Sequence, residues 1–163
     1  FTQDVGREIH LIDYHEASGE GFPYYVEMLN DKGYIYSSTH KAPHDISVRE
    51  LGTGKSRFDQ AAEIGLYFDR VERVANKIDS INAARRFLNI CWFDEVKCGK
   101  GIERLESYRK EWDENLQTYK NKPLHDINSN AADAFQTLAC GHNFQIAVGA
   151  IRTITRTSSK GWT

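Results

Sequence analysis

Three aspartates in remote segments of the chain are the side chains best suited to carry chemistry. Asp45 stands where a predicted strand ends, Asp126 directly precedes the last predicted helix, and Asp133 lies inside that helix. A carboxylate at a strand end sits at the edge of the sheet, where α/β proteins usually bind ligands. Hard oxygen donors of this kind suit Mg²⁺ or Mn²⁺. Two such ions, roughly 3.5–4 Å apart, would activate a water molecule and stabilise the leaving oxygen of a phosphodiester.

Two of these acids also have an ordinary structural role open to them. Asp126 is well placed to be the N-cap of the helix that follows it, and Asp133 could be a solvated helix residue. His44 and His125 each precede one of the acids, but zinc ligation needs four convergent ligands. We therefore interpret the histidines as partners of the acids or as contributors to folding, and spacing alone leaves both interpretations of the acids open.

A glycine-rich stretch at residues 52–56 ends like a phosphate-binding loop. A true P-loop needs glycine five positions before Gly54, and Arg49 stands there, so an ATP site is disfavoured. One interpretation is a mobile loop that presents Lys55, Ser56 and Arg57 to a DNA phosphate. A glycine-rich turn leading into a helix explains the same residues equally well.

The hydrophobic pattern predicts an α/β domain in which these groups are positioned by alternating strands and helices. The first six residues resemble a strand end and a hairpin turn, so at least one strand pair should be antiparallel and the sheet mixed. We expect strands at 7–16, from 34 towards 45, at 68–74, in the short apolar piece 90–93 and at 116–119. We expect helices at 22–32, 57–64, 78–88, 101–115 and 129–140.

Length and composition limit the remaining possibilities. A chain of 163 residues with 40% hydrophobic side chains is one domain, and a net charge of -2 does not by itself indicate a nucleic-acid binder. Three cysteines without a CxxC pair, Cys91, Cys98 and Cys140, fit a reducing cytosol and small apolar packing roles. The sequence shows no signal peptide and no apolar run long enough for a bilayer. We expect a folded domain at 1–145, a tail at 146–163 that is flexible and basic from 152, and a fragment of a longer protein.

Several segments, taken together and in order, resemble the nuclease domain of large terminase subunits of tailed bacteriophages. The similarity covers residues 1 to 140. It is carried by Pro43-His44-Asp45, the stretch RELGTGKSR at 49–57, Trp92-Phe93-Asp94 with Cys98, then Leu105, Tyr108-Arg109 and Glu111-Trp112-Asp113, and finally Pro123-Leu124-His125-Asp126 with Ala132-Asp133-Ala134-Phe135.

The resemblance implies an RNase H-like mixed sheet flanked by helices, following an ATPase motor domain in the full subunit. It implies a metal-dependent endodeoxyribonuclease that cuts concatemeric double-stranded DNA with Mg²⁺ or Mn²⁺ in the host cell cytoplasm. Asp45 matches the second catalytic acid, and Asp133 the acid of the closing helix, with Asp126 a nearby candidate; Asp45 and Asp133 are the implied metal ligands. The small terminase subunit and the portal are implied partners, and the tail is a candidate for portal docking.

Two departures from the family pattern leave other functions open. The family's first catalytic acid lies on a strand before the opening hairpin, and neither Asp4 nor Asp13 falls in that motif. Asn130 stands where the closing motif often has histidine. Another RNase H-like nuclease, such as a resolvase or transposase, and a non-catalytic DNA-binding or docking module therefore remain alternative interpretations.

Overall fold

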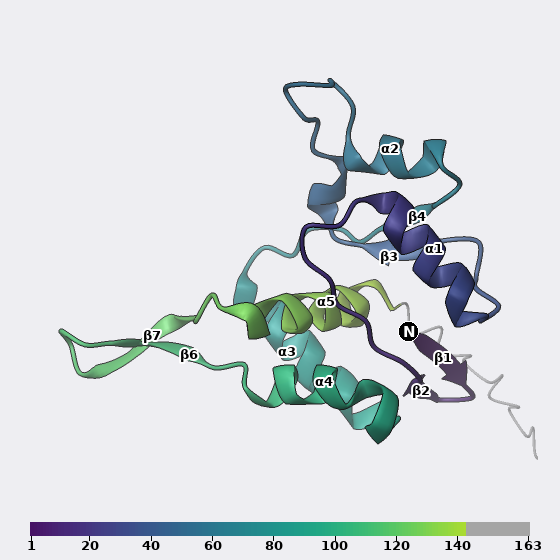
Figure 1. The fold of residues 1–163 in the computed structure, drawn as a ribbon. Helices are drawn as coiled ribbons and strands as arrows, with labels where there is room; N and C mark the ends of the chain where they lie inside the picture. Colours follow the sequence, from purple (N-terminus) through teal and green to yellow (C-terminus); the bar gives the residue numbers. More distant parts are fainter. Residues whose placement is uncertain (143–163) are drawn as a thin grey trace, which may run out of the picture.

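The computed structural model describes residues 1–142, which form an α/β arrangement of helices around small sheets (Figure 1). Strands β1 (Thr2–Val5) and β2 (Glu8–Leu11) are an antiparallel hairpin, and Gly6 has φ 64° in its turn. A side chain rarely adopts this left-handed conformation, so glycine suits the position. Strand β5 (Cys91–Phe93) adds to β2 in parallel, with Ile9 opposite Cys91. The sheet is thus mixed, as the sequence predicts.

A second, parallel pair of strands lies apart from this mixed sheet. Strand β3 (His40–Ala42) pairs with β4 (Phe68–Arg70), and β3 runs through Pro43 into a short 3-10 helix, η1 (His44–Ser47). Helix α2 (Arg57–Glu63) connects η1 to β4 and packs against both. This unit fixes the backbone position of Asp45, directly beyond the end of β3.

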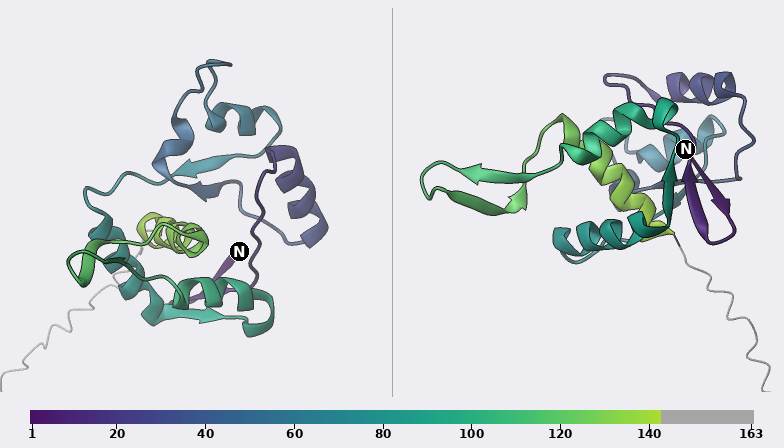
Figure 2. Two further views of the ribbon diagram at one scale, coloured as in Figure 1. Left: turned by 60° about the vertical axis from the view of Figure 1, so that its left-hand side comes forward. Right: turned by 90° about the horizontal axis from the view of Figure 1, so that it is seen from below.

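Helix α5 (Ile127–Gly141) occupies the centre of the described structure. It packs against α3 (Lys77–Phe87), α4 (Glu95–Glu106) and strand β3, and it links the two strand systems (Figure 2). The hydrophobic core forms around it from Ile9, Ala84, Phe87 and Phe135. The rings of Phe87 and Phe135 lie 5.8 Å apart, which holds α3 against α5. The other helices are peripheral: α1 (Phe22–Lys32), which has no buried residue, and the 3-10 turn η2 (Leu88–Ile90).

A two-stranded arm projects from the body between α4 and α5 (Figures 1 and 2). Strands β6 (Lys110–Asp113) and β7 (Thr118–Pro123) are antiparallel, with Trp112 opposite Tyr119. These two rings meet edge to face at 4.9 Å on the exposed surface of the arm. Cross-strand aromatic pairs of this kind stabilise a hairpin that has no other sheet to join.

The arm corrects one prediction from the sequence. A helix was expected over 101–115, but α4 ends at Glu106 and the chain enters β6. The carboxylate of Asp113 accepts hydrogen bonds from the backbone N–H groups of Asn115 and Leu116, and Gln117 adopts φ 49°. These features make a tight turn that the helical spacing of apolar residues did not reveal.

Three strand predictions were also too long or misplaced. The expected strand at 7–16 is confined to β2, and the one at 68–74 to the three residues of β4. The strand expected from residue 34 begins only at His40. Tyr34 and Tyr36 instead donate hydrogen bonds to Asp13 and to the carbonyl of Leu29, so this segment is fixed by side-chain contacts and not by a ladder.

The expected helices 22–32, 57–64, 78–88 and 129–140 are confirmed to within a few residues. Of the expected domain at 1–145, residues 143–145 lie outside the described residues, as does the whole tail at 146–163. No helix of the described residues is long and apolar enough to cross a bilayer.

Candidate functional site

A cavity of about 1280 Å³ lies between the two strand systems and is bordered by α5. Asp45 and Asp133 both line it, although 87 residues separate them in the sequence. Asp45 reaches it from the end of β3, as predicted for a carboxylate at a sheet edge, and Asp133 from the central helix. The fold therefore brings two of the three predicted acids to one hollow of the surface.

The carboxylate of Asp45 is solvent-exposed and is placed by its backbone. Pro43 caps the start of η1 in an extended conformation, and the carbonyl of Asp45 accepts a 3.0 Å hydrogen bond from the N–H of Val48. The side-chain oxygens of Asp45 make no hydrogen bond or ion pair with any residue of the described part of the chain. They are available to a ligand from the cavity.

Asp133 already has a cationic partner. The ammonium of Lys77, at the start of α3, lies 2.5 Å from Asp133 Oδ1. Both side chains are about half-exposed, at 43% and 49%. The second carboxylate oxygen of Asp133 takes no part in this pair.

Asp126 does not line the cavity and instead begins α5. Its carboxylate accepts hydrogen bonds from the backbone N–H of Asn128 at 2.9 Å and from the side-chain amide of Asn128 at 3.1 Å. Partial desolvation acts to raise the pKa of Asp126, but the hydrogen bonds from Asn128 and Ser129 outweigh it, and the pKa lies below its usual value. The helix-capping role that the sequence left open is the one this geometry provides.

The three residues proposed for DNA contact occupy different environments. Ser56 is 4% exposed and forms a capping box with Asp59, so its hydroxyl is committed to the start of α2. Lys55 pairs with Glu63 at 2.5 Å, and Arg57 lies 3.5 Å from Glu50. Lys55 and Arg57 are exposed and can still reach a phosphate, whereas Ser56 acts through the conformation of the loop.

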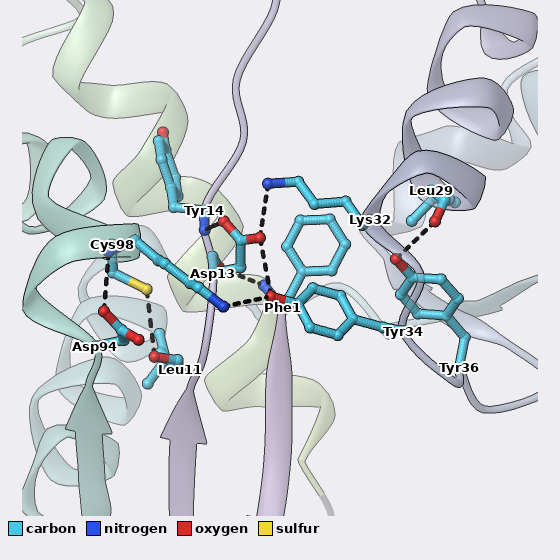
Figure 3. A network of polar contacts seen from close by, with 11 residues as sticks. Phe1, Leu11, Asp13, Tyr14, Leu29, Lys32, Tyr34, Tyr36, Asp94 and Cys98 are labelled. Atoms are coloured by element: carbon cyan, nitrogen blue, oxygen red, sulfur yellow. Dashed lines mark hydrogen bonds and ion pairs between the residues drawn. The ribbon is translucent and has the colours of Figure 1, made fainter.

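A buried acid that the sequence reasoning set aside also borders the cavity. Asp13 is 7% exposed and accepts hydrogen bonds from Lys32 at 2.6 Å and Tyr34 at 3.2 Å (Figure 3). Burial acts to raise the pKa of Asp13, but the hydrogen bonds from Lys32, the Tyr14 backbone and Tyr34 hold it below its usual value. Because its partners lie 19 and 21 residues away, no local motif signals the network.

The arrangement supplies part of a metal site. Within residues 1–142, no group of three or more His, Cys, Asp or Glu side chains is disposed to hold a metal ion. Asp45 and Asp133 have the oxygen chemistry that Mg²⁺ and Mn²⁺ prefer, and they are two carboxylates of an incomplete set. Asp13 does not complete it, because Lys32 and Tyr34 already occupy its carboxylate.

Comparison of the chain with models of protein families, with curated proteins and with solved structures finds no match in any of the three.

Proposed function

We propose that this chain is the nuclease domain of a phage DNA-packaging terminase large subunit, an endodeoxyribonuclease of RNase H-like fold that cuts concatemeric double-stranded DNA. The observation that carries the proposal is the shared cavity of Asp45 and Asp133. The resemblance implies that these two acids are metal ligands, and their place in the lining of one cavity supports that interpretation.

The mixed sheet supports the RNase H-like part of the proposal. An antiparallel hairpin, β1–β2, is extended in parallel by β5. Phe135 of α5 packs with Ile9 and Phe93 of this sheet, and the same helix carries Asp133. The resemblance implies a third acid on the first strand of the family's sheet, in a motif that neither Asp4 nor Asp13 matches. That acid would complete the set that Asp45 and Asp133 begin.

Different residues of this chain would have different roles in the proposed reaction. Asp45 and Asp133 would hold Mg²⁺ or Mn²⁺, which when bound supplies an activated water and charge stabilisation for phosphodiester hydrolysis. Asp126 caps the first turn of α5, the helix that carries Asp133. Lys55 and Arg57 would bind backbone phosphates without reading sequence.

The partners follow from the proposed family. Double-stranded DNA is the substrate, the ATPase motor domain precedes this domain, and the small terminase subunit and the portal complete the packaging machine in the host cell cytoplasm. Portal docking by the tail, residues 152–163, is part of the same proposal and falls outside the described residues.

A plasmid-nicking assay with Mn²⁺ tests the nuclease. The wild-type protein is compared with its Asp45→Asn and Asp133→Asn variants. Both substitutions are expected to abolish nicking. Asp45→Asn should leave the melting temperature unchanged or raised, since removing a carboxylate from an acidic cluster relieves like-charge repulsion, whereas Asp133→Asn loses the ion pair with Lys77 and should lower the melting temperature slightly. Asp69→Asn is the matched control, because Asp69 is an exposed aspartate at a strand pair and does not line the cavity. Wild-type nicking by Asp45→Asn or Asp133→Asn would refute the proposed site.

A non-catalytic DNA-binding or docking module is the second candidate, and the incomplete set of metal ligands favours it. This module would bind duplex DNA equally well with and without divalent metal and would never nick it. A resolvase-type nuclease would instead cut four-way junctions in preference to linear duplex. Running both substrates in the same assay separates these alternatives from the terminase nuclease.

A further inference from the structure

A directional chain of hydrogen bonds runs from Lys97 through Tyr34 to the buried carboxylate of Asp13. The Tyr34 hydroxyl donates its proton to Asp13 Oδ2 at 3.2 Å (Figure 3). The phenol oxygen is left as an acceptor, and the Lys97 ammonium donates to it at 3.2 Å. Lys97 belongs to α4, whereas Tyr34 lies in the segment between α1 and β3. The phenol therefore restrains a lysine that comes from a distant part of the chain.

The charge of Asp13 is balanced by Lys32, so the charge of Lys97 is left over. The Lys32 ammonium lies 2.6 Å from Asp13 Oδ2, and the side chains of this pair are 27% and 7% exposed. Lys97 is exposed and forms no ion pair with any acid of residues 1–142. An ammonium has three N–H donors, of which Tyr34 takes one. One cation in excess, with donors to spare, is thus held at the surface.

The Lys97 ammonium lies at the border of the cavity that Asp45 and Asp133 line. Tyr34, its hydrogen-bond partner, is also a lining residue, as is Cys98, which follows Lys97 on α4. A lysine ammonium is a point charge on a long stem, and it binds phosphate oxygens through charge-assisted hydrogen bonds. Its position therefore suits an anionic chain that runs along the mouth of the cavity.

We propose that Lys97 binds a backbone phosphate of duplex DNA at the border of the cavity, and that Tyr34, anchored on Asp13, is the positioning residue that holds the ammonium there. The inference rests on the proposed function in one respect, that DNA is the ligand. It requires no metal ion, and it applies equally to a non-catalytic DNA-binding module. Because phosphate contacts carry no sequence information, Lys97 adds affinity for every duplex alike.

The restraint by Tyr34 is what distinguishes Lys97 from an ordinary surface lysine. A free lysine side chain has many rotamers, and fixing it on a ligand costs conformational entropy. The hydrogen bond to the phenol restricts these rotamers before DNA arrives. Because two donors of the ammonium remain, Lys97 can bind a phosphate oxygen without leaving Tyr34.

The first experiment measures binding to a short DNA duplex by fluorescence anisotropy, in EDTA and at several salt concentrations. Lys97→Gln is expected to bind about threefold to tenfold more weakly than wild type, and its salt slope should fall by about one, since one phosphate contact is lost. Lys100→Gln is the matched control, because Lys100 is an exposed lysine of the same helix whose ammonium lies 2.7 Å from Glu16. Its affinity and slope should stay near the wild-type values. Wild-type binding by Lys97→Gln, or an equal loss in Lys100→Gln, overturns the proposal.

The second experiment tests the positioning role in the same assay with Tyr34→Phe, which removes the hydroxyl and leaves every lysine in place. Tyr34→Phe is expected to bind the duplex about twofold to fivefold more weakly, because the ammonium is no longer restrained. Tyr36→Phe is the matched control, since the Tyr36 hydroxyl donates to the Leu29 carbonyl at 3.0 Å. It should bind like wild type. Wild-type affinity in Tyr34→Phe, or an equal loss in both variants, refutes positioning by Tyr34.

Plasmid nicking separates failure of this inference from failure of the proposed function. If the wild-type protein binds no duplex, both fail. If wild type nicks plasmid with Mn²⁺ while Lys97→Gln keeps the wild-type affinity for the duplex, the nuclease stands and the contact by Lys97 is refuted. If Lys97→Gln loses affinity and wild type never nicks, the contact stands and belongs to a non-catalytic module.

Discussion

The hydroxyl of Ser80 on α3 is hydrogen-bonded to the side-chain oxygen of Gln136 on α5 at 2.7 Å, and both side chains are buried. The same hydroxyl lies 2.8 Å from the carbonyl of Lys77. This buried polar contact limits how far α3 and α5 can slide along one another. It thereby ties the core of the protein to the Lys77–Asp133 pair at the cavity.

Ser80→Ala is expected to destabilise the protein by about 1–3 kcal/mol, because the buried amide of Gln136 loses its partner. Urea denaturation followed by circular dichroism measures the loss. The double variant Ser80→Ala, Gln136→Leu should recover part of it, since no polar group is then left unsatisfied. If Ser80→Ala is as stable as wild type, the hydrogen bond does not hold the helices together.

Two substitutions at Asp126 decide between its structural and catalytic roles. Asp126→Asn keeps a good N-cap and should leave stability near wild type, whereas Asp126→Ala should cost about 1 kcal/mol. Because Asp126 caps α5 away from the cavity, we expect Asp126→Asn to nick plasmid at the wild-type rate. Loss of nicking in a stable Asp126→Asn protein would instead make this carboxylate a metal ligand.

The exposed cations beside the glycine-rich loop give a prediction about DNA affinity. Replacing Lys55 and Arg57 together by alanine should weaken binding to all duplex sequences alike and flatten the dependence of affinity on salt, because fewer counterions are released. Their partners, Glu63 and Glu50, are acidic, so DNA must displace both ion pairs. Fluorescence anisotropy at several salt concentrations measures the slope, and an unchanged slope would favour a simple turn leading into α2.

The elements that the sequence predicted well are those with a strong local signal. Helix α1 is followed by Gly33 in a left-handed conformation, and α2 begins with the Ser56–Asp59 capping box. The positions of Asp45 near the end of a strand and of Asp126 before a helix were predicted from similar local sequence signals. Such features are decided by a few neighbouring residues, which a single sequence displays.

The missed features depend on contacts between distant residues. The Lys77–Asp133 pair and the buried Asp13 network join segments that nothing in the local pattern connects. The arm was missed for another reason: Leu105, Tyr108 and Trp112 have helical spacing, but Trp112 packs on Tyr119 across a hairpin. Tertiary pairing overrode the periodicity there.

The pH dependence of stability should report on Glu16, which joins the segment after β2 to helix α4. Hydrogen bonds from Arg104 at 3.1 Å, Lys100 at 2.7 Å and the hydroxyl of Tyr14 at 2.6 Å lower the pKa of Glu16 from 4.5 to about 2. A depressed carboxyl pKa stabilises the folded state above the unfolded pKa, and this stabilisation is lost as the pH falls from 4.5 through about 2.

Glu16→Gln should therefore lower the free energy of unfolding at pH 7 by about 1–2 kcal/mol, a value reduced for solvent screening of a surface network. The deficit relative to wild type should shrink as the pH falls below the ordinary glutamate range and vanish near the folded pKa of Glu16, where the wild-type carboxyl is itself protonated. Denaturant titrations at pH 7, 4 and 2.5 provide the measurement, and Glu20→Gln, an exposed glutamate of the same loop, is the control. If the deficit is independent of pH, it comes from lost packing or neutral hydrogen bonds, and the charge of Glu16 does not hold α4 to the segment after β2.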